Sequence, residues 1–172
     1  MRSKLFVPGS RPELFGKALA SAADSLSFDL EDAVAESRKD EARGLLRDFL
    51  VSGQLRETQK TIIVRVNAMD TPHYEQDIAQ VVREGVHLIN LPKPESVEDV
   101  EKAAGAIAYA AKANGVKTLP GLLLNIETPT SLRNVAALAK AHPHVRGLQL
   151  GLGDLFNPYN IKRREPTAIT EV

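Results

Sequence analysis

The chain has 172 residues, 43% of them hydrophobic, which favours a single domain with a substantial core. Its formal net charge of zero argues against general nucleic-acid or membrane-surface binding, and the absence of cysteine excludes disulfides and thiolate metal sites. No apolar segment has the length of a signal-peptide core or a transmembrane helix, so we expect a cytoplasmic location.

Short apolar runs alternate with longer amphipathic stretches along the chain. The runs are continuous in apolar residues rather than alternating, so we expect strands that are mostly buried on both faces. The expected strands are residues 4–7, 25–30, 61–66, 86–91, 119–126 and 146–152.

Signals for helix starts lie between these strands. Residues 10–13, Ser-Arg-Pro-Glu, have a capping-box pattern with proline in the first turn. Residues 37–40 and 96–99 predict two further helix starts, each with serine first and an acidic residue in the first turn. An alanine-rich segment continues the helix after Ser96, and Asn114-Gly115 predicts its end.

The alternation of strands and helices, at a spacing near 30 residues, predicts parallel strands joined by right-handed crossovers. A doubly wound sheet and a barrel both satisfy this pattern. Charged or strongly polar residues follow all five strands after the first, whereas an open sheet would gather them at one switch point. We therefore expect an α/β fold of the TIM (β/α)8 barrel type with about six βα units. Because a complete barrel needs about 250 residues, residues 1–172 are expected to be one barrel domain, truncated before the last two units.

Glu127 and Asp154, which follow the fifth and sixth strands, are candidate metal ligands. Their hard oxygen atoms suit Mg²⁺ or Mn²⁺, and Mg²⁺ usually takes one or two carboxylates together with water and substrate oxygens. Gly151 and Gly153 flank the approach to Asp154, as expected where the backbone comes close to a ligand. Alternatively, Glu127 caps the next helix and Asp154 makes a turn, and spacing alone does not decide between the two.

Arg65 ends the third strand, where its guanidinium could bind a substrate carboxylate through two parallel hydrogen bonds. The alternative is a buried ion pair with Glu31 or Asp29, and the two roles can hold together. Strand alternation places Asp29 and Glu31 on one side. Crowded carboxylates usually form a solvated acidic loop, but beside an arginine and a metal we favour a supporting role for Glu31 and Asp32.

The remaining ionisable candidates carry weaker signals. Lys93 could in principle form a Schiff base, but it is followed by a proline and an electrostatic role is favoured. The histidines lack the spacing of metal ligands and are expected to be structural or surface residues. They are His73, His87, His142 and His144.

Motifs in series along the whole chain resemble those of the citrate lyase beta-subunit (CitE-like) family. This family belongs to the HpcH/HpaI aldolase superfamily, in which malyl-CoA and beta-methylmalyl-CoA lyases are close relatives. The motifs are RSKLFVPGSRP at 2–12, DLEDAV at 29–34, VRVN at 64–67, LPK at 91–93, IET at 126–128 and GLGDL at 151–155.

The resemblance implies a Mg²⁺-dependent carbon–carbon lyase that is a homotrimer or hexamer. Its substrate would be a citryl- or malyl-type thioester of coenzyme A or an acyl carrier protein, and one product an α-keto acid such as oxaloacetate or glyoxylate. Glu127 and Asp154 match the metal ligands of the family. Asp154 and Gly153 are also expected at the substrate.

By the same resemblance, Arg65, Glu31 and Asp32 form the catalytic set. Arg65 would bind the carboxylate of the α-keto acid, and the two acidic residues would surround the waters on the metal. The segment from residue 6 to residue 17 would approach the thioester carrier, which makes Phe6, Arg11 and Lys17 further substrate-binding candidates.

No general base is evident among the 172 residues. In the malyl-CoA lyase branch, a catalytic aspartate from the carboxy-terminal region acts on a neighbouring subunit, and this sequence does not contain that region. The alternatives are an acyl-CoA thioesterase with the same metal site and a non-catalytic or regulatory paralogue that keeps metal and α-keto acid binding. A phosphate-binding barrel enzyme of unrelated chemistry is a weaker third.

Overall fold

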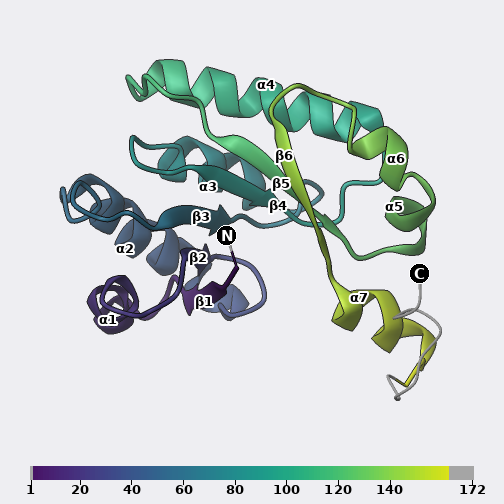
Figure 1. The fold of residues 1–172 in the computed structure, drawn as a ribbon, viewed down its shortest axis with the longest axis horizontal. Coiled ribbons are helices and arrows are strands. Elements are labelled where there is room, and N and C mark those ends of the chain that lie inside the picture. Colours follow the sequence, from purple (N-terminus) through teal and green to yellow (C-terminus); the bar gives the residue numbers. More distant parts are fainter. Residues whose placement is uncertain (1, 163–172) are drawn as a thin grey trace.

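Six parallel strands form one sheet in the computed structural model, which describes residues 2–162 (Figure 1). The strands lie side by side in chain order, and each overlaps one of the six predicted runs. Their bounds are β1 (Lys4–Pro8), β2 (Ser25–Asp29), β3 (Thr61–Arg65), β4 (Leu88–Leu91), β5 (Gly121–Ile126) and β6 (Val145–Leu150). The predicted strand–helix alternation is therefore confirmed.

Helical segments connect successive strands and follow β6. The α-helices are α1 (Phe15–Leu19), α2 (Lys39–Val51), α3 (Tyr74–Val81), α4 (Val97–Ala113), α5 (Pro129–Arg133), α6 (Val135–Leu138) and α7 (Leu152–Phe156). Three 3₁₀ helices are also present in the described part of the chain: η1 (Pro12–Leu14), η2 (Glu36–Arg38) and η3 (Asn157–Tyr159). Helix α2 contacts α3, and α3 contacts α4, so the longer helices form a layer that follows the sheet. None of the helices within residues 2–162 has both the length and the apolar character needed to cross a membrane.

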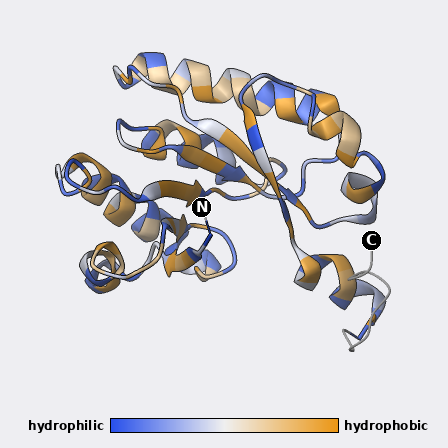
Figure 2. Cartoon of the chain, in the orientation of Figure 1, coloured by the Kyte–Doolittle hydropathy of each residue, from blue (hydrophilic) through white to orange (hydrophobic). Residues whose placement is uncertain are grey.

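The two faces of the sheet differ in chemistry because successive side chains of a strand point to opposite sides. One face packs against the helices, and its residues, such as Leu26, Phe28 and Val64, belong to the main hydrophobic cluster. The central strands are accordingly hydrophobic in Figure 2. The other face carries a series of hydrogen-bonded polar side chains: Lys4, Asp29, Arg65, Asn90, Asn125 and Gln149. The core thus lies between sheet and helices, and the polar face is left for a site.

The expectation of strands buried on both faces holds for the centre of the sheet. All residues of β2 and β5 are buried. Strand β6 instead exposes every second side chain, including Leu148 and Leu150, and β1 exposes Leu5 and Phe6. Each of these two strands has a single neighbouring strand within residues 2–162, so its side chains have fewer neighbours than those of the central strands.

Of the three predicted helix starts, only the one at Ser96 has the expected cap. Its side chain accepts a hydrogen bond from the Asp99 backbone N–H, and the Asp99 carboxylate accepts one from the Ser96 backbone N–H, which completes a capping box. The capping box at 10–13 is wrong, because η1 begins at Pro12 without any side-chain cap. Ser37 lies inside η2, where it caps nothing. The predicted end of α4 is confirmed by Gly115, with a φ of 68°.

The Ser96→Ala variant is expected to lose about 1 kcal/mol of folding stability, because an N-cap hydroxyl satisfies an otherwise free backbone N–H. Ser37→Ala removes the same hydroxyl from a position without a side-chain cap, so its stability should match that of the wild type. Urea unfolding followed by circular dichroism would measure both. Equal losses would show that the cap at Ser96 is not what stabilises α4.

Candidate functional site

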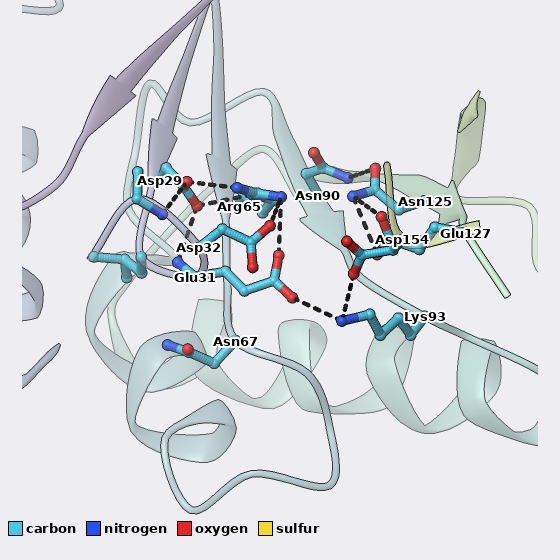
Figure 3. A network of polar contacts seen from close by, with 12 residues as sticks. Asp29, Glu31, Asp32, Arg65, Asn67, Asn90, Lys93, Asn125, Glu127 and Asp154 are labelled. Atoms are coloured by element: carbon cyan, nitrogen blue, oxygen red, sulfur yellow. Dashed lines mark hydrogen bonds and ion pairs between the residues drawn. The ribbon is translucent and has the colours of Figure 1, made fainter. Parts of the chain in front are cut away.

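The polar residues that follow the strands converge at one edge of the sheet, as predicted for the carboxyl ends of parallel strands. Asp29 ends β2 and Arg65 ends β3, while Lys93 and Glu127 follow β4 and β5 closely. Asp154 lies in α7, directly after β6. Figure 3 shows one series of polar contacts that runs from Asp29 through Arg65, Glu31 and Lys93 to Asp154. Beside it, a second series runs from Asn90 through Asn125 to Glu127.

Arg65 is the centre of the first half of this series. Its Nε and Nη2 donate to the two carboxylate oxygens of Asp29 at 2.8 and 2.5 Å. Its Nη1 lies 3.0 Å from Asp32 Oδ2 and 3.0 Å from Glu31 Oε2. The expected buried ion pair is therefore confirmed, with Glu31 on the same side as Asp29. The two parallel hydrogen bonds foreseen for a substrate go to Asp29, so a substrate carboxylate would have to use the guanidinium edge that bears Nη1.

The charges in this half do not cancel, since three carboxylates surround one guanidinium. Asp29 and Glu31 are buried, which excludes a solvated acidic loop for these two, whereas Asp32 is exposed. Burial raises the pKa of Glu31 to about 7, although the Arg65 charge acts in the opposite direction. Burial alone would lower the pKa of Arg65, but its bonds to Asp29 keep that pKa above the ordinary value. The site therefore has an excess of negative charge beside a permanently charged arginine.

Lys93 links the two halves of the site. Its Nζ lies 2.7 Å from Asp154 Oδ2 and 3.9 Å from Glu31 Oε1. Burial alone would lower the pKa of Lys93, but Asp154 raises it above the usual value, so the ammonium stays charged. A Schiff-base lysine needs a lowered pKa to act as a nucleophile. The geometry therefore supports the electrostatic role expected for Lys93.

Glu127 and Asp154 form the second half. Glu127 is 5% exposed, and its carboxylate accepts only long contacts of 3.4 and 3.5 Å from Asn125 Nδ2. Burial and the nearby Asp154 charge both raise the pKa of Glu127. The capping alternative for Glu127 is wrong, because Thr128 caps α5. Lys93 pairs with Asp154, whereas Glu127 has no close hydrogen-bond donor. A further cation would relieve the repulsion between the two carboxylates.

A hard divalent cation fits this pair of carboxylates. Within residues 2–162, no group of three or more His, Asp or Glu side chains is arranged to hold a metal ion. Zinc-type sites built entirely from protein ligands need such a group, whereas Mg²⁺ is usually bound by one or two carboxylates and keeps several waters. The ligands present therefore match Mg²⁺ or Mn²⁺ better than zinc.

The two glycines near Asp154 have different neighbours. A Cβ at Gly151 would overlap the Glu127 side chain, including its carboxylate, so Gly151 makes room for Glu127 rather than for a ligand. At Gly153 the nearest atom to such a Cβ is Asn157 Nδ2 at 3.9 Å, which is ordinary contact. The backbone at Gly153 therefore remains open to a ligand.

The Gly151→Ala variant is expected to lose about 1–3 kcal/mol of stability, the usual cost of overpacking, and to displace Glu127. Its Mg²⁺ affinity should fall as well. Gly153→Ala adds the same methyl group in open space and should keep wild-type stability. Thermal unfolding with and without Mg²⁺ measures both quantities. Wild-type behaviour of Gly151→Ala would contradict the close packing of Glu127 against position 151.

The three residues expected at the thioester carrier lie in different surroundings. Phe6 is at the site, with its ring centroid 5.4 Å from Arg65 Cζ and 4.5 Å from Lys4 Nζ. Arg11 is exposed and pairs with Glu13 at 2.9 Å. Lys17 is exposed on α1. The structure thus brings Phe6 to Arg65 and leaves the two basic residues on the surface beside β1.

The histidine contacts agree with structural roles. His73 Nε2 lies 2.6 Å from Glu36 Oε1, and His87 Nδ1 accepts a hydrogen bond of 3.0 Å from the Ile62 backbone. The rings of His142 and His144 pack on one another with centroids 5.3 Å apart.

Several residues on the polar face of the sheet were not among the predicted site residues. Lys4 Nζ donates to Asn90 Oδ1 at 3.1 Å and to Gln149 Oε1 at 2.6 Å. Asn90 Nδ2 donates to Asn125 Oδ1 at 2.8 Å. Burial and the Arg65 charge lower the pKa of Lys4 to about 8. In the sequence, the sign of this polar face was one asparagine near the end of each of two mainly apolar runs, Asn90 and Asn125.

The chain matches the model of a known family. A model of the family described as HpcH/HpaI aldolase/citrate lyase matches residues 2–169. The chain belongs to this family. Its six βα units have the arrangement of a (β/α) barrel, which confirms the predicted fold class.

Similar members of the HpcH/HpaI family include lyases and a thioesterase. The citrate lyase subunit beta of Haemophilus influenzae is 36% identical over 170 residues, which are 98% of this chain and 57% of that protein. The (3S)-malyl-CoA thioesterase of Cereibacter sphaeroides is 38% identical over 154 residues, which are 90% of this chain and 50% of that protein. The chain therefore spans about half the length of these curated relatives.

A solved structure of the same family has a similar fold. It is the citrate lyase beta subunit of M. tuberculosis complexed with oxaloacetate and magnesium, with a TM-score of 0.73 and 31% identity. The match covers 94% of this chain and 64% of that one.

Proposed function

We propose that this chain forms the metal and α-keto acid site of a Mg²⁺-dependent carbon–carbon lyase. The substrate would be a citryl- or malyl-type thioester, and oxaloacetate or glyoxylate one of the products. The main support is that Glu127 and Asp154, at adjacent strand ends, face Arg65 across a single polar site. The M. tuberculosis relative, which was solved with magnesium and oxaloacetate, gives independent support.

In such a cleavage the substrate hydroxyl loses a proton and the carbon–carbon bond breaks. Its electron pair moves to the α-carbon of the thioester, which then takes up a proton. Glu127 and Asp154 would hold a Mg²⁺ ion, which would supply positive charge at the substrate oxygens. Arg65 orients the substrate carboxylate through Nη1, which aligns the breaking bond. Glu31 and Asp32 hold that nitrogen in place.

The thioester end of the substrate has fewer contacts within residues 2–162. Phe6 lies beside Arg65 and offers an apolar surface next to the reacting carbons. We place Arg11 and Lys17 toward the phosphates of coenzyme A or an acyl carrier protein, since both are exposed cations after β1. The general base is not assigned. We further propose that the chain supplies six of eight βα units and works as a homo-oligomer.

A thioesterase is the second candidate, favoured by the 38% identity to the (3S)-malyl-CoA thioesterase. There, water attacks the thioester carbonyl and the coenzyme A thiol leaves. The metal site would serve both reactions, so the two candidates differ in their products rather than in their ligands.

A product assay separates these candidates. The chain is incubated with Mg²⁺ and either citryl-CoA or malyl-CoA, and both the free thiol and the α-keto acid are measured. A lyase releases oxaloacetate or glyoxylate without free thiol, whereas a thioesterase releases free thiol without the keto acid. Absence of both products, with oxaloacetate binding retained in calorimetry, would replace the proposal by a non-catalytic binding paralogue.

A further inference from the structure

A buried lysine contacts the loop that follows β2 and carries Glu31 and Asp32, called the acidic loop below. Lys39 is the first residue of α2 and is 8% exposed. Its Nζ donates to Leu30 O at 3.1 Å, to Glu31 O at 3.0 Å and to Asn67 Oδ1 at 2.6 Å. An ammonium has three donors, so all of them are used, and two of them hold the loop that follows β2.

Lys39 is itself held by buried polar groups. Asn67 donates from its backbone and side-chain nitrogens to Asp77 Oδ2 at 2.8 and 2.6 Å. Arg43 Nε donates to the other oxygen of Asp77 at 2.7 Å. Asn67, Asp77 and Arg43 are all buried and come from the end of β3, from α3 and from α2. The ammonium therefore has a defined position, set by three elements of the fold.

The acidic loop is held both at its side chains and at its backbone. Arg65 binds the carboxylates of Glu31 and Asp32. Lys39 binds the backbone carbonyls of Leu30 and Glu31. The Arg65 guanidinium restrains the ends of the Glu31 and Asp32 side chains. The loop backbone is held by Lys39 at its carbonyls and by the Asp29 carboxylate at its amides. Fixing the backbone of Glu31 also fixes where its carboxylate can lie.

We propose that Lys39 is a positioning residue for the site, which sets the place of Glu31 and Asp32 and, through them, of Arg65 Nη1. Its own ammonium contacts neither the candidate metal ligands nor the face of Arg65 that is open to a carboxylate. An effect of Lys39 on catalysis rests on the proposed function. Its effect on the backbone of the acidic loop can be measured separately.

Lys60 provides a matched control at the opposite end of β2. Its Nζ donates to two backbone carbonyls, Ser21 O at 2.5 Å and Ala23 O at 2.6 Å. Lys60→Met and Lys39→Met therefore both remove an ammonium and leave backbone acceptors without a partner. Both should lose stability. Only Lys39→Met should change the site.

Two measurements on the full chain distinguish positioning from plain stabilisation. Calorimetry with Mg²⁺ and oxaloacetate should show about 10–100-fold weaker oxaloacetate binding for Lys39→Met, the range found when a group supporting a site is lost. It should show wild-type binding for Lys60→Met. Hydrogen exchange should be faster in Lys39→Met at the amides of Glu31 and Ala33, which donate to Asp29. Should Lys39→Met not fold, Lys39→Gln, which keeps an amide donor, replaces it.

Unchanged exchange at these amides together with wild-type oxaloacetate affinity would overturn the role of Lys39. Equal changes in Lys60→Met would do the same, since they would reflect general destabilisation. If the wild type itself bound neither Mg²⁺ nor oxaloacetate, the proposed function would fail. The exchange comparison would then still decide whether Lys39 holds the loop.

Discussion

The Arg65→Met variant is expected to lose about 3–5 kcal/mol of folding stability, the usual effect of removing one partner of a buried ion pair. The side chain of Arg65 is 11% exposed and that of Asp29 is 1% exposed. Without the guanidinium, the buried Asp29 carboxylate would lose its paired cation and two hydrogen bonds. Urea unfolding measures the loss.

The Arg47→Met variant is the control for this prediction. Arg47 also pairs with an aspartate, Asp48, but both side chains are exposed, at 42% and 67%. Surface pairs contribute about 0–1 kcal/mol, so this variant should remain near the wild type. The double variant Asp29→Leu/Arg65→Met should recover part of the stability, since it removes both buried charges. A single Arg65→Met variant as stable as Arg47→Met would contradict the buried pair.

Glu127→Gln and Asp154→Asn are each expected to weaken Mg²⁺ binding by about 100-fold or more, roughly 2.7 kcal/mol. Each variant removes one of the two carboxylates that face the proposed metal position. Isothermal titration calorimetry with Mg²⁺ measures the effect. Without Mg²⁺, Glu127→Gln should be at least as stable as the wild type, because a buried charge that repels Asp154 has been removed.

For a metal ligand, the substitution lowers Mg²⁺ affinity but does not lower stability without Mg²⁺. This combination distinguishes a metal ligand from a structural carboxylate. A structural Glu127 would lose stability on substitution and leave Mg²⁺ affinity unchanged. Glu101→Gln is the control, since Glu101 is exposed on α4 and lies outside the polar series of the site. Unchanged Mg²⁺ affinity in both Glu127→Gln and Asp154→Asn would remove the metal assignment.

The strand ends were the most predictable part of this molecule. Arg65, Glu127 and Asp154 could be placed together because parallel strands end on one side of a sheet, whatever the details of packing. The Ser96 cap and the stop at Gly115 were also predictable, since both depend on a few neighbouring residues. These features depend only on neighbouring residues or on the regular geometry of parallel strands.

Partner choice could not be predicted in the same way. That Arg65 turns two nitrogens to Asp29 depends on side-chain rotamers and burial, which no spacing encodes. Lys4 starts β1, yet it reaches Gln149 of β6 through the curvature of the sheet. Lys39 was noted only as part of a helix-start pattern, because its acceptors come from the segments that follow β2 and β3 rather than from neighbouring turns.

The backbone of Lys93 points to a trade-off between stability and function. Its φ of 52° is one that only glycine adopts freely, and for other residues it costs about 1–2 kcal/mol. Glycine at this position would relieve the strain but would also remove the ammonium beside Asp154. If stability alone determined the residue at position 93, it would not be a lysine. Position 93 is therefore one where a stabilising substitution is easy to find and should impair the site.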